Sequence, residues 1–172
     1  MKEWQAFRID YRWEPVVTHD GEIFTYPGCL TADFRSRFSK PAVYRWLFKR
    51  ADGCPSAAYI GEAENLAQRI QGYHWPGQSQ QTNLRMKADF QEHIESGGTV
   101  ELQVLVFEPF AINNVNVHNE SQLGDAYIRK MMENFLLADH DSVACELRNA
   151  KSNSIERRLR KSAKAATAGG MS

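Results

Sequence analysis

Four side chains that could do chemistry follow one another in the first half of the chain. Tyr44 and Tyr59 lie in two segments rich in β-branched and aromatic residues, and Arg69 and Tyr73 follow, four residues apart. Tyrosines on neighbouring antiparallel strands can sit close on one face, and residues four apart share one side of a helix. A guanidinium can bind two phosphate oxygens at once. These types and spacings predict a polar site at a hairpin and the helix after it.

Two more polar groups come much later, Glu133 within Met132–Leu137 and Asn149 at the end of a closing segment. Glu133 has Arg129 and Lys130 on one side and leucines on the other, so it lies at the polar–apolar boundary of a helix. A glutamate can hold one Mg²⁺ or Mn²⁺ that keeps most of its waters. An ion pair with Arg129 or Lys130 is the alternative.

Several common chemistries are excluded by missing motifs. The chain has no glycine-rich or Gly-Lys-Ser/Thr phosphate loop, no Gly-x-Ser-x-Gly elbow and no His-Glu-x-x-His or Cys-x-x-Cys pattern. The five histidines are scattered without ligand spacing. The three cysteines are widely spaced and odd in number, which favours free thiols in a reducing cytoplasm. We therefore expect no organic cofactor, and any metal should be held mainly by oxygen.

The elements that must position these groups predict a small α+β domain. Two strands, 42–49 and 57–61, should form an antiparallel hairpin, and 100–107 should add a central strand to a short mixed three-stranded sheet. Another strand is predicted over 4–11. Helices are expected at 32–38, 64–73, 83–95 and 121–139. In the last helix we expect an apolar face made of Leu123, Tyr127, Met131, Phe135 and Ala138. The stretches 74–82 and 111–119 are predicted to be loops.

The ordered set of motifs resembles the GIY-YIG nuclease family over about residues 41–150. Tyr44 in Ala42-Val43-Tyr44 is similar to the tyrosine of the first motif, and Tyr59-Ile60-Gly61 is an intact second motif. The spacing of Arg69 and Tyr73 is similar to that in the nuclease domain of the bacterial excision-repair incision subunit. Glu133 resembles the metal-binding glutamate of the family, and Asn149 its closing asparagine. The chain departs from the pattern at Ala42, where glycine is usual, and at Glu62, where a basic residue is frequent.

The resemblance implies hydrolysis of phosphodiester bonds in DNA with one Mg²⁺ or Mn²⁺ on Glu133. Tyr44 would be the general base or would position the water, Tyr59 would position phosphate or water, and Arg69 would bind the phosphate oxygens. His74, beside Tyr73, is an auxiliary proton carrier in this scheme. Single residues also have plain structural explanations: strand tyrosines pack at the edge of a core, and Glu62 can be a helix-start carboxylate.

Residues outside the core are expected to contact nucleic acid. Of 172 residues, 42% are hydrophobic and the net charge is zero, but Arg148 onward carries seven Lys or Arg against one acid. Within the tail, residues 151–172, the basic cluster attracts phosphate backbones, with a solubilising terminal helix as the alternative. It consists of Arg157, Arg158, Arg160 and Lys161. Gly61, Trp75 and the loop glutamines are further candidates for contact with phosphates or bases. Residues 1–40 form an N-terminal extension in this scheme.

Three function hypotheses stay open on the sequence alone. The first is an active DNA endonuclease, with a homodimer expected if it cuts both strands of a two-fold symmetric site. The second is a binding module that keeps the fold without catalysis. The third is a nuclease for RNA or for branched or damaged DNA, since specificity comes from contacts outside the core. No apolar run approaches the roughly 20 residues of a membrane span.

Overall fold

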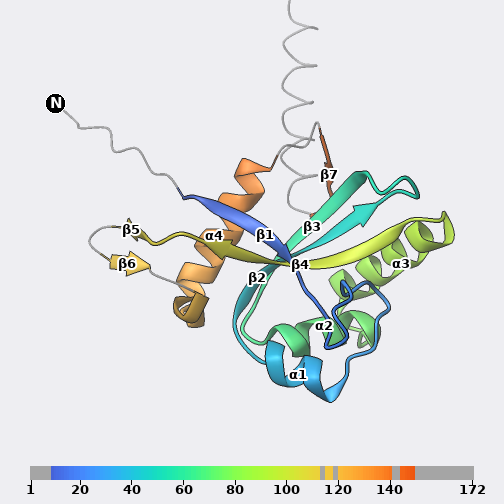
Figure 1. Cartoon of the computed structure of the whole chain (residues 1–172), viewed down its shortest axis with the longest axis horizontal. Helices are drawn as coiled ribbons and strands as arrows, with labels where there is room; N and C mark the ends of the chain where they lie inside the picture. The colour runs from blue at the N-terminus through green and yellow to red at the C-terminus, as the bar shows by residue number, and fades with distance from the viewer. Residues whose placement is uncertain (1–8, 113–114, 118–119, 141–143, 150–172) are drawn as a thin grey trace, which may run out of the picture.

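The computed structural model describes residues 9–112, 115–117, 120–140 and 144–149. It is α+β, with a five-stranded sheet in the order β1-β4-β2-β3-β7. The strands are β1 (Tyr11–Pro15), β2 (Ala42–Lys49), β3 (Pro55–Ala63), β4 (Thr99–Phe107) and β7 (Glu146–Leu147). The helices are α1 (Ala32–Phe38), α2 (Leu66–His74), α3 (Gln81–Glu95) and α4 (Ala126–Asp139), with a short 3-10 helix η1 (Glu120–Gly124) before α4. Figure 1 shows α1, α2 and α3 grouped on one side of the sheet and α4 on the other.

The predicted hairpin is confirmed and forms the middle of the sheet. β2 and β3 pair antiparallel, with Tyr44 opposite Gly61 and Trp46 opposite Tyr59. The connecting turn closes through the Arg50 N–H, which donates to the carbonyl oxygen of Cys54, and Gly53 takes a φ of 80°. Because side chains alternate across a sheet, this register puts Tyr44 and Tyr59 on one face as diagonal neighbours. The predicted position of the two tyrosines on one face is therefore confirmed.

Two apolar clusters hold the layers together, one on each face of the sheet. The even-numbered side chains of β2, among them Trp46 and Phe48, pack with Phe90 of α3 and the buried face of α2. Val43 and Ile60 on the opposite face pack against α4. The apolar spacing predicted for α2 is confirmed, since Leu66, Ile70 and Tyr73 are all fully buried.

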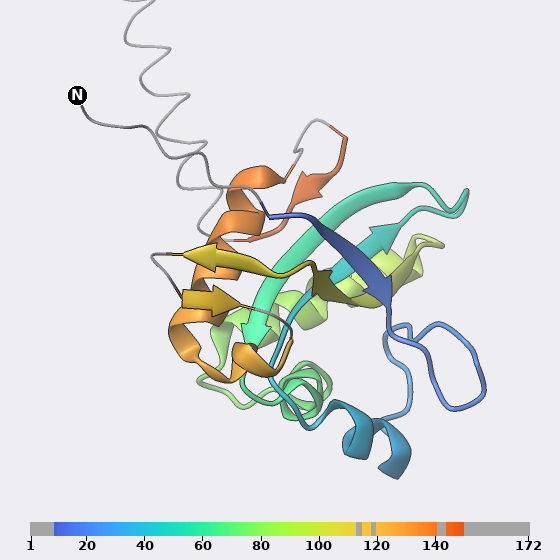
Figure 2. The ribbon, with the colours of Figure 1, turned by 60° about the vertical axis from the view of Figure 1, so that its left-hand side comes forward.

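The expectation of a three-stranded sheet is wrong, because two further strands join its edges. β1 begins at Tyr11 and pairs antiparallel with β4. The chain after it follows β4 as well, with the N–H groups of Val16 and Tyr26 donating to carbonyl oxygens of that strand. Residues 9–40 thus share one sheet and one core with the segment from residue 41. β7 adds parallel to β3 through Ala57 and Ala58, as Figure 2 shows at the edge of the sheet.

Two other expectations in the second half are corrected. The loop predicted over 111–119 contains a small hairpin of β5 (Phe110–Ile112) and β6 (Val115–Val117). The buried side of α4 consists of Arg129, Met132 and Leu136, while Tyr127 is 85% exposed. The predicted apolar face is confirmed in part, because Leu123 is buried and Met131 and Phe135 pack against the same apolar cluster. It is wrong at Tyr127 and Ala138, which are exposed.

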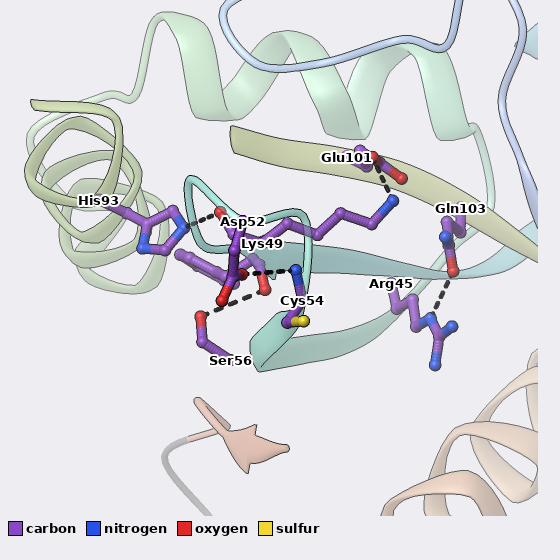
Figure 3. Close-up of polar contacts among 9 residues, drawn as sticks. Arg45, Lys49, Asp52, Cys54, Ser56, His93, Glu101 and Gln103 are labelled. Carbon is purple, nitrogen blue, oxygen red and sulfur yellow. Dashed lines mark hydrogen bonds and ion pairs between the residues drawn. The ribbon is translucent and has the colours of Figure 1, made fainter. Parts of the chain in front are cut away.

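Polar side chains also connect β2 and β4, as Figure 3 shows. The Arg45 Nε–H donates to Gln103 at 2.7 Å, and Lys49 pairs with Glu101 at 2.5 Å. Nε2 of His93 lies 2.8 Å from the carbonyl oxygen of Lys49. This histidine thus has a structural partner on a strand end. All three cysteines are free, as expected.

Some predictions fall outside this description. The start of the strand predicted over 4–11 and the basic residues Arg157, Arg158, Arg160 and Lys161 lie outside the described residues. Among the helices that the structure does describe, none is both long enough and apolar enough to cross a membrane.

Candidate active site

A polar pocket of about 520 Å³ lies at the free end of the β3 edge. The N–H and C=O of Ile60 both bond to Asn149, so the peptide groups of residues 58, 60 and 62 point away from β2. β7 pairs with β3 at Ala58, and the side chain of Asn149 takes the place of a strand at Ile60. No described strand continues along β3 beyond these two residues. The pocket begins at Glu62, where β3 has no further described neighbour on this edge. Its principal lining residues are Tyr59, Gly61 and Glu62 of β3, Arg69 of α2, Asn83 of α3, and Arg129 and Glu133 of α4.

Behind the pocket wall, a compact cluster of two tyrosines holds one arginine. The hydroxyl oxygens of Tyr44 and Tyr73 lie 2.7 Å apart, and the Arg69 Nε–H donates to Tyr44 at 3.0 Å. The Arg69 guanidinium lies over the Tyr73 ring, 4.8 Å from its centroid. The helical spacing that put Arg69 and Tyr73 on one side of α2 is thus confirmed. This cluster fixes the arginine where α2 crosses the end of β3.

Gly61 is required at this place because Tyr44 lies directly over it. A Cβ on Gly61 would meet the Tyr44 hydroxyl at 2.7 Å and its Cζ at 2.8 Å, closer than side chains approach. The glycine of the second motif therefore has a steric role in the described structure. It also lines the pocket, as the prediction of a contact with nucleic acid requires.

Arg69 has a third partner that sequence analysis did not find. Its Nη1 donates to Oδ1 of Asn83 at 2.9 Å, and Nδ2 of Asn83 donates to Oε1 of Gln80 at 3.0 Å. Asn83 is buried on the side of α3 that also carries Met86 and Phe90. A polar residue in line with apolar ones is the signal that could have revealed it.

Glu62 and the buried Arg129 form a partly buried ion pair on the α4 side of the pocket. The Arg129 Nε–H donates to Glu62 at 2.8 Å, and its Nη1 donates to the carbonyl oxygens of Leu123 and Gly124. Glu62 thus meets the arginine of another element and does not start a helix. One turn further along α4, Glu133 also lines the pocket.

The carboxylates of the pocket fit a single hydrated divalent cation. The described residues contain no group of three or more His, Cys, Asp or Glu side chains that could hold a metal ion. Glu62 bonds to Arg129, and Glu64 and Glu133 are the other carboxylates that line the pocket. Mg²⁺ commonly binds proteins through one or two carboxylates and keeps its remaining waters. Glu133 of α4 is thus a lining carboxylate of the type that could hold such an ion.

Burial controls the protonation of the tyrosine cluster. Tyr44 and Tyr73 are fully buried, and loss of hydration raises the pKa of both phenols well above the usual value. For Tyr73 the neighbouring Tyr44 adds to the increase. Both hydroxyls therefore remain protonated near neutral pH. Tyr59, in contrast, lines the pocket itself, and its ring meets that of Tyr73 edge to face.

Three predicted site residues lie elsewhere. Asn149 is buried against β3, where Oδ1 accepts from the Ile60 N–H and Nδ2 donates to the Ile60 carbonyl, as a neighbouring strand would. The His74 ring packs on Tyr26 and Trp75 and does not line the pocket, and burial lowers its pKa. Trp75, at the end of α2, is 64% exposed.

Comparisons of the chain with protein-family models, with curated proteins and with solved structures found no match.

Proposed function

We propose that this chain is a metal-dependent endonuclease that hydrolyses phosphodiester bonds in DNA, of the GIY-YIG type that its motifs resemble. One observation carries the proposal: Tyr59, Arg69 and Glu133 come from three separate elements and line the same polar pocket. A phenol, a guanidinium and a carboxylate are the groups that phosphate transfer needs for orientation, charge neutralisation and metal binding.

Arg69 is the phosphate-binding group in this proposal. A guanidinium has five N–H groups, and the hydrogen bonds of Arg69 to the described residues use Nε and one N–H of Nη1. The remaining N–H groups can form the paired hydrogen bonds that suit a phosphate. Because Tyr44, Tyr73 and Asn83 already hold the guanidinium, Arg69 needs little reorganisation to bind a phosphate.

Glu133 would hold one Mg²⁺ or Mn²⁺, and the bound ion would lower the pKa of a coordinated water and neutralise phosphate charge. During hydrolysis a water oxygen bonds to phosphorus, one ester P–O bond breaks, and a proton passes to the leaving oxygen. Tyr59 is the tyrosine that lines the space where this water and the phosphate would lie.

The geometry favours a different role for Tyr44 from the general base implied by the resemblance. Its hydroxyl is fully buried, bonded to Tyr73 and Arg69, and its pKa is raised by burial. A phenol in this state is a poor acceptor of a proton from water. We therefore assign Tyr44 to holding Arg69.

Residues outside the pocket lining are assigned to binding DNA. The exposed Trp75 and the basic tail residues Arg157, Arg158, Arg160 and Lys161 are proposed to contact DNA through stacking and phosphate pairing. A homodimer is proposed if the enzyme cuts both strands. The free cysteines suit the reducing cytoplasm as the compartment.

A plasmid-nicking assay tests this function. Purified protein is incubated with supercoiled plasmid in Mg²⁺, Mn²⁺ or EDTA, beside Glu133→Ala and the neighbouring control Asn134→Ala. Asn134 is exposed and bonds to the backbone of its own helix. We expect metal-dependent nicking that is lost in Glu133→Ala and kept in the control. If the folded protein cuts no plasmid, single-stranded DNA, branched DNA or RNA with either metal, the enzyme proposal is wrong. Cleavage confined to RNA would identify a ribonuclease.

A further inference from the structure

We propose that Asn83 is a positioning residue that fixes the guanidinium of Arg69 and connects it to the loop 75–80. The inference rests on the proposed nuclease function of the pocket. It adds a residue from α3 that none of the recognised motifs contains.

Both ends of the Asn83 side-chain amide form hydrogen bonds. Oδ1 accepts from Nη1 of Arg69, and Nδ2 donates to Oε1 of Gln80. Since a guanidinium only donates hydrogen bonds, Asn83 must turn its oxygen toward Arg69. The amide therefore has one orientation, and both of its ends are engaged.

Burial of an amide at position 83 would lower stability if the amide had no hydrogen-bonding role. Asn83 is only 3% exposed, on the helix face that carries Met86 and Phe90. A buried amide destabilises a protein unless it is hydrogen-bonded, so an apolar residue would serve packing better. Gly72 also leaves it room, because a Cβ there would come within 3.0 Å of Nδ2 of Asn83.

Asn83 holds a part of the Arg69 guanidinium that the two tyrosines leave without a contact. Tyr44 bonds to its Nε and the ring of Tyr73 supports its flat face, but neither engages the outer nitrogens. Asn83 supplies that contact at Nη1. A guanidinium fixed at both ends loses little freedom when a phosphate binds, which strengthens binding in the transition state.

The contacts continue from Asn83 into the loop. Oε1 of Gln80 also accepts from the Gly77 N–H at 3.2 Å, and the loop begins with the exposed Trp75. A chain of hydrogen bonds thus leads from Arg69 through Asn83 and Gln80 to a segment that a nucleic-acid strand can reach. A strand that orders this loop would stabilise the working position of Arg69.

The test combines kinetics with an observation of Arg69 itself. Asn83→Ala should lower kcat about tenfold, the factor that corresponds to about 1.4 kcal/mol, with KM changed less than about twofold. The control is Thr82→Ala, an exposed position beside it on α3. The Nε–Hε resonance of Arg69, identified by its loss in Arg69→Lys, should be sharp in the wild type and broadened in Asn83→Ala.

Further variants separate positioning from folding. Asn83→Asp keeps an acceptor for Arg69 and should keep the sharp resonance. In an Arg69→Ala background, Asn83→Ala should cause no further loss of activity. Gln80→Ala should lower kcat by about threefold, a factor below that of Asn83→Ala, because only the link to the loop is cut.

The outcomes are distinct. Unchanged kcat and an unchanged Arg69 resonance in Asn83→Ala would overturn the proposal, and unchanged kcat in Gln80→Ala would overturn the link to the loop. If the wild type cuts no nucleic acid, the proposed function fails. The resonance comparison still decides whether Asn83 positions Arg69.

Discussion

The substitution Gly61→Ala tests the packing that holds the candidate site. Gly61 lies in β3 without a left-handed φ, so the backbone accepts alanine and the effect is steric. To restore an ordinary contact of 3.4 Å from the present 2.7 Å, the Tyr44 hydroxyl would have to withdraw by about 0.7 Å. It cannot do so freely, because Tyr73 and Arg69 both bond to it.

The expected cost follows from two terms. Overpacking a buried site costs about 1–3 kcal/mol, and weakening the two hydrogen bonds adds about 1 kcal/mol. We therefore expect the free energy of unfolding to fall by about 2–4 kcal/mol and Tm by roughly 5–15 °C for a chain of this size. Nicking activity should fall as well, because Arg69 loses its partner.

Urea unfolding followed by tryptophan fluorescence measures the effect, since Trp46 is fully buried against Tyr73. Gly124→Ala is the matched control, because a Cβ at Gly124 meets nothing within 4 Å. Its effect should stay within about 0.5 kcal/mol. In a Tyr44→Phe background the cost of Gly61→Ala should be smaller, since the nearest atom is gone. A Gly61→Ala protein as stable as the control would refute the steric reasoning.

The remaining predictions concern the edge of the sheet, the ion pair and one histidine. Asn149→Leu should lower the free energy of unfolding by about 1–3 kcal/mol in urea titration, because two buried backbone groups of β3 lose their partner; an unchanged midpoint would contradict this. Glu62→Gln should cost about 1–3 kcal/mol, because Arg129 keeps a buried charge, whereas Glu14→Gln at an exposed pair should cost less than about 0.5 kcal/mol; equal costs would refute the argument. Burial lowers the pKa of His74, so the unfolded chain takes up the proton first and stability should decline as pH falls below about 6.5. Thermal melts from pH 7 to 5 should show a shallower decline in His74→Gln, and equal slopes would contradict the assignment.

The parts of the fold with strong local signals could be predicted from the sequence. α1 has the predicted bounds, with Thr31 as its N-terminal cap. The hairpin of β2 and β3 follows from their β-branched and aromatic residues and from the turn residues between them. The position of Tyr44 and Tyr59 on one face follows from the register of this hairpin. These features are local, so a window of the sequence contains the information that determines them.

The rest depends on partners distant in the chain. β7 has two residues and forms through pairing with β3, which no local pattern indicates. The buried face of α4 was predicted only in part, because it includes Arg129, whose burial depends on Glu62 of β3. Asn83 was missed for the same reason, since its partner Arg69 belongs to a different helix.

The most direct test of the central claim compares two arginines in one nicking assay. Arg69→Met removes the guanidinium proposed to bind phosphate, and Arg85→Met removes one on α3 that bonds to the backbone of Arg148 outside the pocket. With circular dichroism confirming that both variants fold, the rate of metal-dependent plasmid nicking is measured beside the wild type. We expect Arg69→Met to lose at least about 100-fold in rate, as loss of a charge-stabilising donor does, and Arg85→Met to stay within a few-fold. Equal rates in the two variants, or no nicking by the folded wild-type protein, would contradict the account.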